Sequence, residues 1–129
     1  MIALDTNVVV RFLLADDKAQ AARSRAIFES EPVLLASSVL LETEWVLRGA
    51  YGLTRDDVVR LLRGVLGLAN VATDDPAVAS QAIEWHSRGL DFADALHLAS
   101  TSSADRFVTF DAKLVKTAGK LEAGKVFVA

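Results

Sequence analysis

Short apolar runs alternate with longer amphipathic stretches along the whole chain, and this alternation restricts its fold more than any other feature. The runs have the length and composition of buried strands. Because they are flanked by helical patterns, we expect a parallel sheet covered on both faces. The pattern predicts an α/β fold: a three-layer α/β/α sandwich around a central, mostly parallel twisted sheet. The expected strands are residues 2–4, 33–36, 70–73, 106–110 and 126–128.

Capping residues mark the expected helix starts. Asp17 has the spacing of a capping box with Gln20, and Ser37 and Ser38 are plausible caps for the helix after the second strand. Thr54 opens another helix, and Asp75-Pro76 places a proline at the first helical position of the next. The expected helices cover residues 7–14, 17 onward, 39–52, 56–66, 76 to about 89, 91–100 and 112–118.

The 129 residues contain no linker or repeat, so we expect a single domain over residues 1–129. Half of the residues are hydrophobic, which predicts an ordered globular protein. No apolar run approaches the roughly 18 residues needed to cross a bilayer, and the N-terminus lacks the pattern of a signal peptide. With no cysteine, disulfides and thiolate metal sites are excluded. We expect no membrane association and a cytoplasmic location.

The net charge of −3 argues against a protein that holds nucleic acid by bulk positive charge. Four carboxylates gathered at one site would exceed this charge by themselves and leave the remaining surface slightly positive. The acidic balance therefore weakens a nucleic-acid function without excluding it.

Four acidic residues from separate segments are expected at one edge of the sheet. Asp5 and Asp111 directly follow the first and fourth predicted strands, Glu42 lies one turn into a helix, and Asp94 lies at a helix start. Ligands of such sheets bind outside the carboxyl ends of the strands. The spacing therefore predicts that Asp5, Glu42, Asp94 and Asp111 converge.

Glu42 and Glu44 are distinguished by their helical neighbours. Glu42 is surrounded mainly by apolar residues, Trp45 among them, so we expect it to face the interior and to need a cation. Glu44 has Arg48 four residues later, the spacing of a surface ion pair.

Residues 89–99 contain two acidic residues and a histidine that could belong either to the site or to the helix and core. Asp91 is placed to cap the helix, whereas Asp94 has apolar neighbours at helical spacing and calls for a cation. His97 lies one turn after Asp94 and is either a packed core residue or a neighbour of the site, while His86 is expected to be solvated.

Clustered carboxylates repel one another and require a cation. Oxygen ligands without cysteine point to Mg²⁺ or Mn²⁺. Such ions activate water and stabilise charge on a phosphate, the chemistry of phosphodiester hydrolysis. Polar donors beside the acids are either supports for the acids or ordinary caps: Thr6, Asn7, Ser38 and Thr109.

Four motif blocks resemble those of the PIN-domain family, and among them the VapC-like ribonuclease toxins of toxin–antitoxin pairs. The resemblance extends over essentially the whole chain, with the blocks in the family's order and spacing. The blocks are Leu4-Asp5-Thr6-Asn7-Val8, residues 40–48 around Glu42, Asp91-Phe92-Ala93-Asp94-Ala95-Leu96-His97, and Val108-Thr109-Phe110-Asp111.

The resemblance implies a PIN-like sandwich with Mg²⁺- or Mn²⁺-dependent endoribonuclease activity, a homodimer, and inhibition by a co-encoded antitoxin. It implies that Asp5 and Asp94 are the principal metal ligands, with Glu42 and Asp111 binding directly or through water. Asn7 and Thr109 match polar positions that accompany these acids. The implied reaction is attack of water on an RNA phosphate that leaves 5′-phosphate and 3′-hydroxyl ends.

Three basic residues near Asp5 or Asp111 either steer phosphates or belong to solvated helix faces. They are Arg11, Lys113 and Lys116.

A broad apolar face is formed by Val58, Leu61, Leu62 and Val65, with Trp45 and Leu47 before it. This face belongs either to the core or to a dimer or antitoxin interface.

Two other functions stay open. One is phosphoryl transfer through an aspartyl-phosphate on Asp5, although haloacid-dehalogenase-type phosphatases carry an acid where this chain has Asn7. The other is a non-catalytic module that binds RNA or protein on the same fold.

Overall fold

The structure is a computed structural model that describes residues 1–129, in two compact units, Met1–Pro76 and Ala77–Ala129. The α/β class with parallel strands, predicted from the alternating pattern, is confirmed. None of the seven helices has the length and apolar character that crossing a bilayer requires. The first unit contains β1 (Ile2–Ala3), α1 (Thr6–Leu14), α2 (Lys18–Ser30), β2 (Val33–Leu35), α3 (Ser37–Gly49), α4 (Arg55–Leu66) and β3 (Val71–Thr73). The elements that follow are α5 (Pro76–Ser87), α6 (Phe92–Ser100), β4 (Phe107–Thr109), α7 (Ala112–Leu121) and β5 (Val126–Val128).

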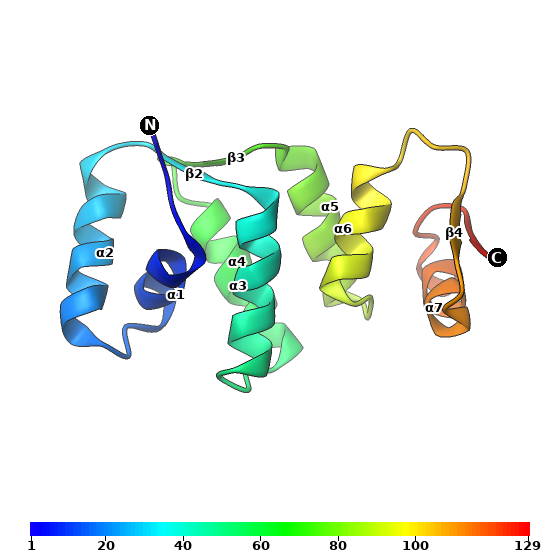
Figure 1. The fold of residues 1–129 in the computed structure, drawn as a ribbon, viewed down its shortest axis with the longest axis horizontal. Coiled ribbons are helices and arrows are strands. Elements are labelled where there is room, and N and C mark those ends of the chain that lie inside the picture. The colour runs from blue at the N-terminus through cyan, green and yellow to red at the C-terminus, as the bar shows by residue number, and fades with distance from the viewer. The chain divides into compact units, whose positions relative to one another are not determined.

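The sheet of the first unit is parallel, in the order β1-β2-β3 (Figure 1). Its register pairs Ile2 with Val33 and Val33 with Val71. The central strand is the most deeply covered, since Val33 and Leu35 are fully buried. Both β1 and β2 lead directly into helices, so Asp5 and the start of α3 lie at the carboxyl ends of neighbouring strands.

The helices of the first unit pack through the apolar positions that the sequence pattern selected. α1 packs against α2 and α3, and the rings of Phe12 and Phe28 stack with their centroids 4.0 Å apart. On α4, Val58, Leu62 and Val65 are buried. These residues of the broad apolar face therefore belong to the core, as one of the two interpretations held.

The start of α3 differs from the expectation that Ser37 or Ser38 caps the helix. The capping position is Ala36, which has no side chain able to accept a hydrogen bond. The cap is supplied instead by Asp74, which follows β3. Its Oδ1 accepts hydrogen bonds from the Ser37 amide at 3.1 Å and from the Ser37 hydroxyl at 2.7 Å. The Ser37 hydroxyl therefore acts as a donor to Asp74 and does not cap the helix.

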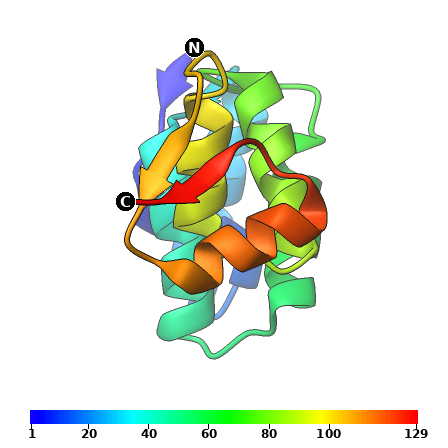
Figure 2. The ribbon, with the colours of Figure 1, turned by 90° about the vertical axis from the view of Figure 1, so that its right-hand side faces the viewer.

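In the second unit, β4 and β5 run parallel, with Phe107 paired to Val126 (Figure 2). α7 connects the two strands and packs against both of them. The rings of His86 on α5 and Phe92 on α6 meet edge to face at 5.4 Å. The buried apolar side chains of this unit include Ile83, Leu90, Phe92, Leu96 and Leu114.

Candidate functional site

Asp5 begins the site in the first unit. It is the N-terminal cap of α1, and its Oδ1 accepts a hydrogen bond from the Thr6 amide at 2.8 Å. This bond fixes the orientation of the carboxylate and leaves Oδ2 without a hydrogen bond inside the protein.

Asp5 and Glu42 lie together in a hollow of about 220 Å³. Asp5 comes from the end of β1 and Glu42 from the second turn of α3, so the packing of α1 on α3 brings the two carboxylates to one place. Asn7 and Arg11 line the same hollow, as do Thr6, Val10, Val46 and Tyr51.

The expected burial of Glu42 and Glu44 is wrong for both residues. Glu42 is exposed, and Glu44 is 1% exposed although its pairing with Arg48 is confirmed at 2.8 Å. The buried stripe of α3 runs through Leu40, Thr43, Glu44 and Leu47, the i, i+3, i+4, i+7 pattern of a core-facing helix. Glu42 lies outside this stripe and is therefore accessible to a ligand.

Thr6 lies deeper than the carboxylates that it accompanies. Its side chain is 5% exposed, and its hydroxyl oxygen has no hydrogen-bond partner within the protein. A buried hydroxyl without a partner costs roughly 1–3 kcal/mol. Because Thr6 also lines the hollow, a bound water or ligand group there would satisfy this hydroxyl.

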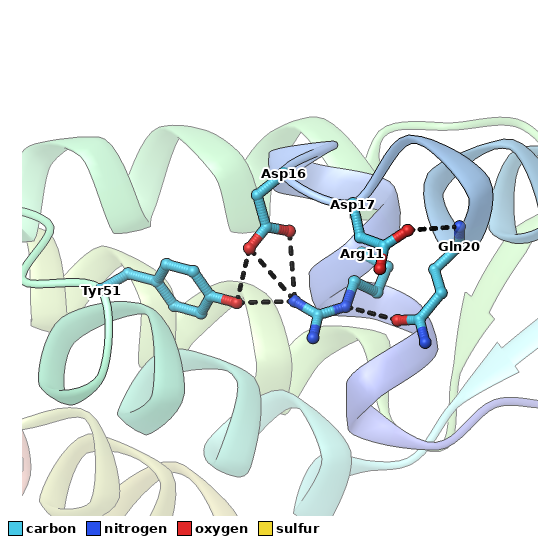
Figure 3. Close-up of polar contacts among 5 residues, drawn as sticks. All are labelled: Arg11, Asp16, Asp17, Gln20 and Tyr51. Carbon is cyan, nitrogen blue, oxygen red and sulfur yellow. Dashed lines mark hydrogen bonds and ion pairs between the residues drawn. The ribbon is translucent and has the colours of Figure 1, made fainter.

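Arg11 is held by three residues that the sequence did not identify (Figure 3). Its Nη1 donates to Asp16 at 3.1 Å and to the Tyr51 hydroxyl at 2.7 Å, and its Nε donates to Gln20 at 2.6 Å. Tyr51 donates in turn to Asp16 at 2.9 Å, and this bond lowers the pKa of the Asp16 carboxyl. The guanidinium is thus fixed at the edge of the hollow, with Nη2 outside this network.

The second unit holds the other acids. Asp91 caps α6 by accepting a bond from the Asp94 amide at 3.2 Å, which confirms the capping interpretation. Asp111 caps α7, and its Oδ1 accepts bonds from the amides of Lys113 at 3.0 Å and Leu114 at 3.1 Å. As with Asp5, the cap leaves Oδ2 of Asp111 without a protein partner.

The pKa of Asp94 is raised above its ordinary value. The largest cause is burial of the partly covered carboxyl, and the charge of Asp91 acts in the same direction. The charge of Asp111 also raises this pKa, while His97 lowers it. The charges of Asp91 and Asp111 therefore disfavour the ionised form of Asp94, and a bound cation would offset this effect.

The expectation that His86 is solvated is wrong, and of the two interpretations of His97 the structure supports the one that places it beside the acids. His86 is 2% exposed, and its Nδ1 lies 2.7 Å from the carbonyl oxygen of Leu90. His97 is exposed on α6 and lies near enough to Asp94 to affect its pKa. His97 is thus the histidine beside the acids, and His86 is the packed one.

The remaining candidates of the second unit surround Asp111. The Thr109 hydroxyl accepts a hydrogen bond from the Asp111 amide at 3.0 Å, so this threonine supports the loop that carries the acid. Lys113 and Lys116 have exposed side chains on α7. Their accessibility is compatible with a phosphate contact and with a solvated helix face alike.

The sequence that carries these acids matches a known protein family. The sequence profile of the PIN domain matches residues 2–120. The chain belongs to the PIN-domain family. No curated protein and no solved structure shows significant similarity to it. PIN domains are nuclease folds that commonly depend on metal ions, so the family places this chain among the hydrolases.

The donor set of this PIN domain fits a hard divalent cation. Asp5 and Glu42 supply carboxylate oxygens to one hollow, and Asp94 and Asp111 form a repelling pair in the other unit. Mg²⁺ and Mn²⁺ prefer such oxygen ligands. Within the structure, no group of three or more His, Asp or Glu side chains is gathered around one point. Convergence of all four acids stays a prediction.

Proposed function

We propose that this PIN domain is a Mg²⁺- or Mn²⁺-dependent endoribonuclease that hydrolyses phosphodiester bonds of RNA in the cytoplasm. The observation that carries the proposal is the pairing of Asp5 with Glu42 in one hollow of a PIN domain. The caps add to it, because they fix both Asp5 and Asp111 while leaving one oxygen of each for a ligand.

The proposed metal centre uses acids from both units. Asp5 and Asp94 are its principal ligands, and Glu42 and Asp111 complete it directly or through water. This assignment requires residues 1–129 to form a single domain, which we include in the proposal. The raised pKa of Asp94 supports the assignment of this residue as a ligand. Burial and neighbouring negative charges disfavour its ionised form, and a bound cation would offset both effects.

A bound dication would supply charge to stabilise the attacked phosphate and would lower the pKa of a water. The protein's own residues orient the reactants. The helix cap holds Asp5 in a fixed direction, Asn7 offers an amide beside it, and Thr6 offers an unsatisfied hydroxyl. Attack of water in line with the departing 3′-oxygen leaves 5′-phosphate and 3′-hydroxyl ends, since the 2′-hydroxyl takes no part.

Basic residues around the acids are proposed to hold the RNA backbone. Arg11 is the best placed, because its guanidinium lies at the hollow that contains Asp5 and Glu42. Lys113 and Lys116 follow Asp111 on an exposed helix. Thr109 supports this arrangement by fixing the Asp111 amide.

We further propose that the protein is the toxin of a toxin–antitoxin pair, with a homodimeric structure and a co-encoded antitoxin as inhibitor. The exposed Trp45 supports a protein interface, since 63% of this large aromatic side chain is accessible on α3. Leu47, which precedes the same apolar face in sequence, is buried and takes no part.

The proposal is tested by incubating the purified protein with mixed single-stranded RNAs and Mg²⁺ or Mn²⁺. We expect internal cleavage that EDTA abolishes and that Asp94→Asn reduces at least tenfold. The 5′ ends should be substrates for a 5′-phosphate-dependent exonuclease. Equal cutting by Asp94→Asn would contradict the site, and hydrolysis of a simple phosphomonoester without RNA cleavage would favour the aspartyl-phosphate mechanism instead.

A further inference from the structure

A second hollow, of about 340 Å³, lies between α1 and α2 and is lined by two arginines, by polar side chains and by the apolar Val8 and Ile27. Arg11 and Arg23 contribute guanidinium groups, and Asn7 and Gln20 contribute amides. No Asp or Glu lines it, in contrast to the hollow of Asp5 and Glu42. Its volume lies in the range of about 300–1,000 Å³ that is usual for ligand pockets.

The two hollows adjoin, since Asn7 and Arg11 line both of them. A ligand that extends from the carboxylates past Asn7 therefore enters the hollow that Arg23 lines. RNA is such a ligand, because a negatively charged phosphate recurs at every nucleotide. The acidic hollow matches the position of a phosphate with its metal, and the cationic hollow matches a neighbouring phosphate without one.

The two arginines contribute differently to this hollow. Asp16 balances the charge of Arg11, so Arg11 offers donors in a fixed direction and little net charge. Arg23 is exposed on α2 and forms no ion pair, so its charge is available to an anion. Guanidinium groups bind phosphate oxygens through two parallel hydrogen bonds.

We propose that the hollow between α1 and α2 is a subsite for an RNA phosphate next to the one that is cleaved, with Arg23 as its principal cation. This assignment rests on the proposed ribonuclease function. Tyr51 and Asp16 are positioning residues in it, because they orient the Arg11 guanidinium that borders both hollows.

The test compares Arg23→Gln with Arg25→Gln, an exposed arginine on the same helix that does not line the hollow. Binding of a fluorescein-labelled single-stranded RNA is measured by anisotropy in EDTA at several KCl concentrations, so that no RNA is cut. Each phosphate contact on a single strand adds about 0.7 to the slope of log K against log salt. We expect Arg23→Gln to lower that slope by about 0.7 and to weaken binding several-fold at low salt.

Arg25→Gln is expected to change the slope little, and thermal melting should be the same for both variants. Equal slopes for the two variants would overturn the subsite. The outcome is separable from that of the proposed function. Cleavage by the unaltered protein with no effect of Arg23 refutes only the subsite. Arg23-dependent binding in a protein that never cuts RNA refutes only the nuclease.

Discussion

Two glutamates two positions apart on α3 have different roles: one belongs to the candidate site and the other to the core. Glu42 is exposed beside Asp5, whereas Glu44 is buried and bonded to Arg48. The same conservative change at each position should therefore have different consequences. Amide replacement removes the charge and keeps the shape of the side chain.

We expect Glu42→Gln to lower RNA cleavage by about 10- to 100-fold, as is usual for residues around a metal, and to change stability by less than about 0.5 kcal/mol. Glu44→Gln should instead destabilise the fold by about 1–3 kcal/mol, because it removes the charge-assisted bond that the buried carboxylate accepts from Arg48. Urea denaturation and a cleavage assay on both variants check this pair of outcomes. A large loss of stability in Glu42→Gln would mean that its role is structural.

We expect the carboxylate of Asp94 to lower the stability of the folded protein when no metal is bound. Its pKa is raised, first by burial and then by Asp91, so the folded state disfavours its ionised form. The contribution of Asp94 to the free energy of unfolding is therefore fully present in acid, where the carboxyl is protonated. It is lost as the pH rises through the folded-state pKa of Asp94. In EDTA at pH 7, Asp94→Asn should therefore have a higher Tm than the unaltered protein, and the difference should shrink towards pH 4.

Adding Mn²⁺ should raise the Tm of the unaltered protein by more than that of Asp94→Asn, since an ion that binds the folded state stabilises it in proportion to its affinity. Differential scanning fluorimetry across pH, with and without the ion, measures both effects. A lower Tm for Asp94→Asn in EDTA would show that the carboxylate stabilises the fold.

At the level of elements, α3 depends on a residue outside itself. Asp74 follows β3 and accepts two hydrogen bonds from Ser37, and the bond from the Ser37 hydroxyl is the main reason that the pKa of Asp74 is lowered. A lowered pKa means that the stabilisation is present at neutral pH and is lost as pH falls through the folded-state pKa.

Asp74→Ala should cost about 0.5–2 kcal/mol at pH 7, the usual range for a helix cap, and the difference should vanish in acid. Ser37→Ala should share part of the loss, while Ser38→Ala, next to it and without such bonds, should have little effect. Chemical denaturation at pH 7 and pH 3 checks the series. An equal loss in both serine variants would contradict the role of Asp74.

The elements themselves were predictable because their signals are local. Three helices are capped by the side chains of Asp17, Thr54 and Asp91. Each accepts a hydrogen bond from the backbone amide three residues later, which confirms the predicted caps. The network of Arg11 was not predictable, because Tyr51 lies 40 positions away in the sequence. The cap from Asp74 crosses 37 positions in the same way. Such partners are set by how strands and helices pack, which a single sequence does not specify.

The site shows the same division. Asp5 and Glu42 were predicted to meet, and they share a hollow. The error at Glu42 and Glu44 came from treating Trp45 as a core residue, although it is exposed. The leucines at positions 40 and 47 were the signal that would have identified the buried stripe through Glu44. His86 was misplaced because the phase of a short amphipathic helix is poorly determined by its own residues.

For the whole molecule, the proposed metal centre takes its acids from Met1–Pro76 and from Ala77–Ala129. Each unit by itself presents two of the four proposed carboxylate ligands. The PIN domain spans both units, since its profile covers residues 2–120. A change in either unit should therefore weaken binding of the same ion.

Calorimetric titration of Mn²⁺ into the unaltered protein, Asp5→Asn and Asp94→Asn tests the proposed centre. We expect either substitution to weaken the tightest binding event at least tenfold, although the two residues lie in different units. Asp17→Asn, which alters the cap of α2 and does not line the hollow of Asp5 and Glu42, serves as the control and should bind as the unaltered protein does. If Asp94→Asn binds Mn²⁺ with unchanged affinity while Asp5→Asn does not, the shared centre does not exist.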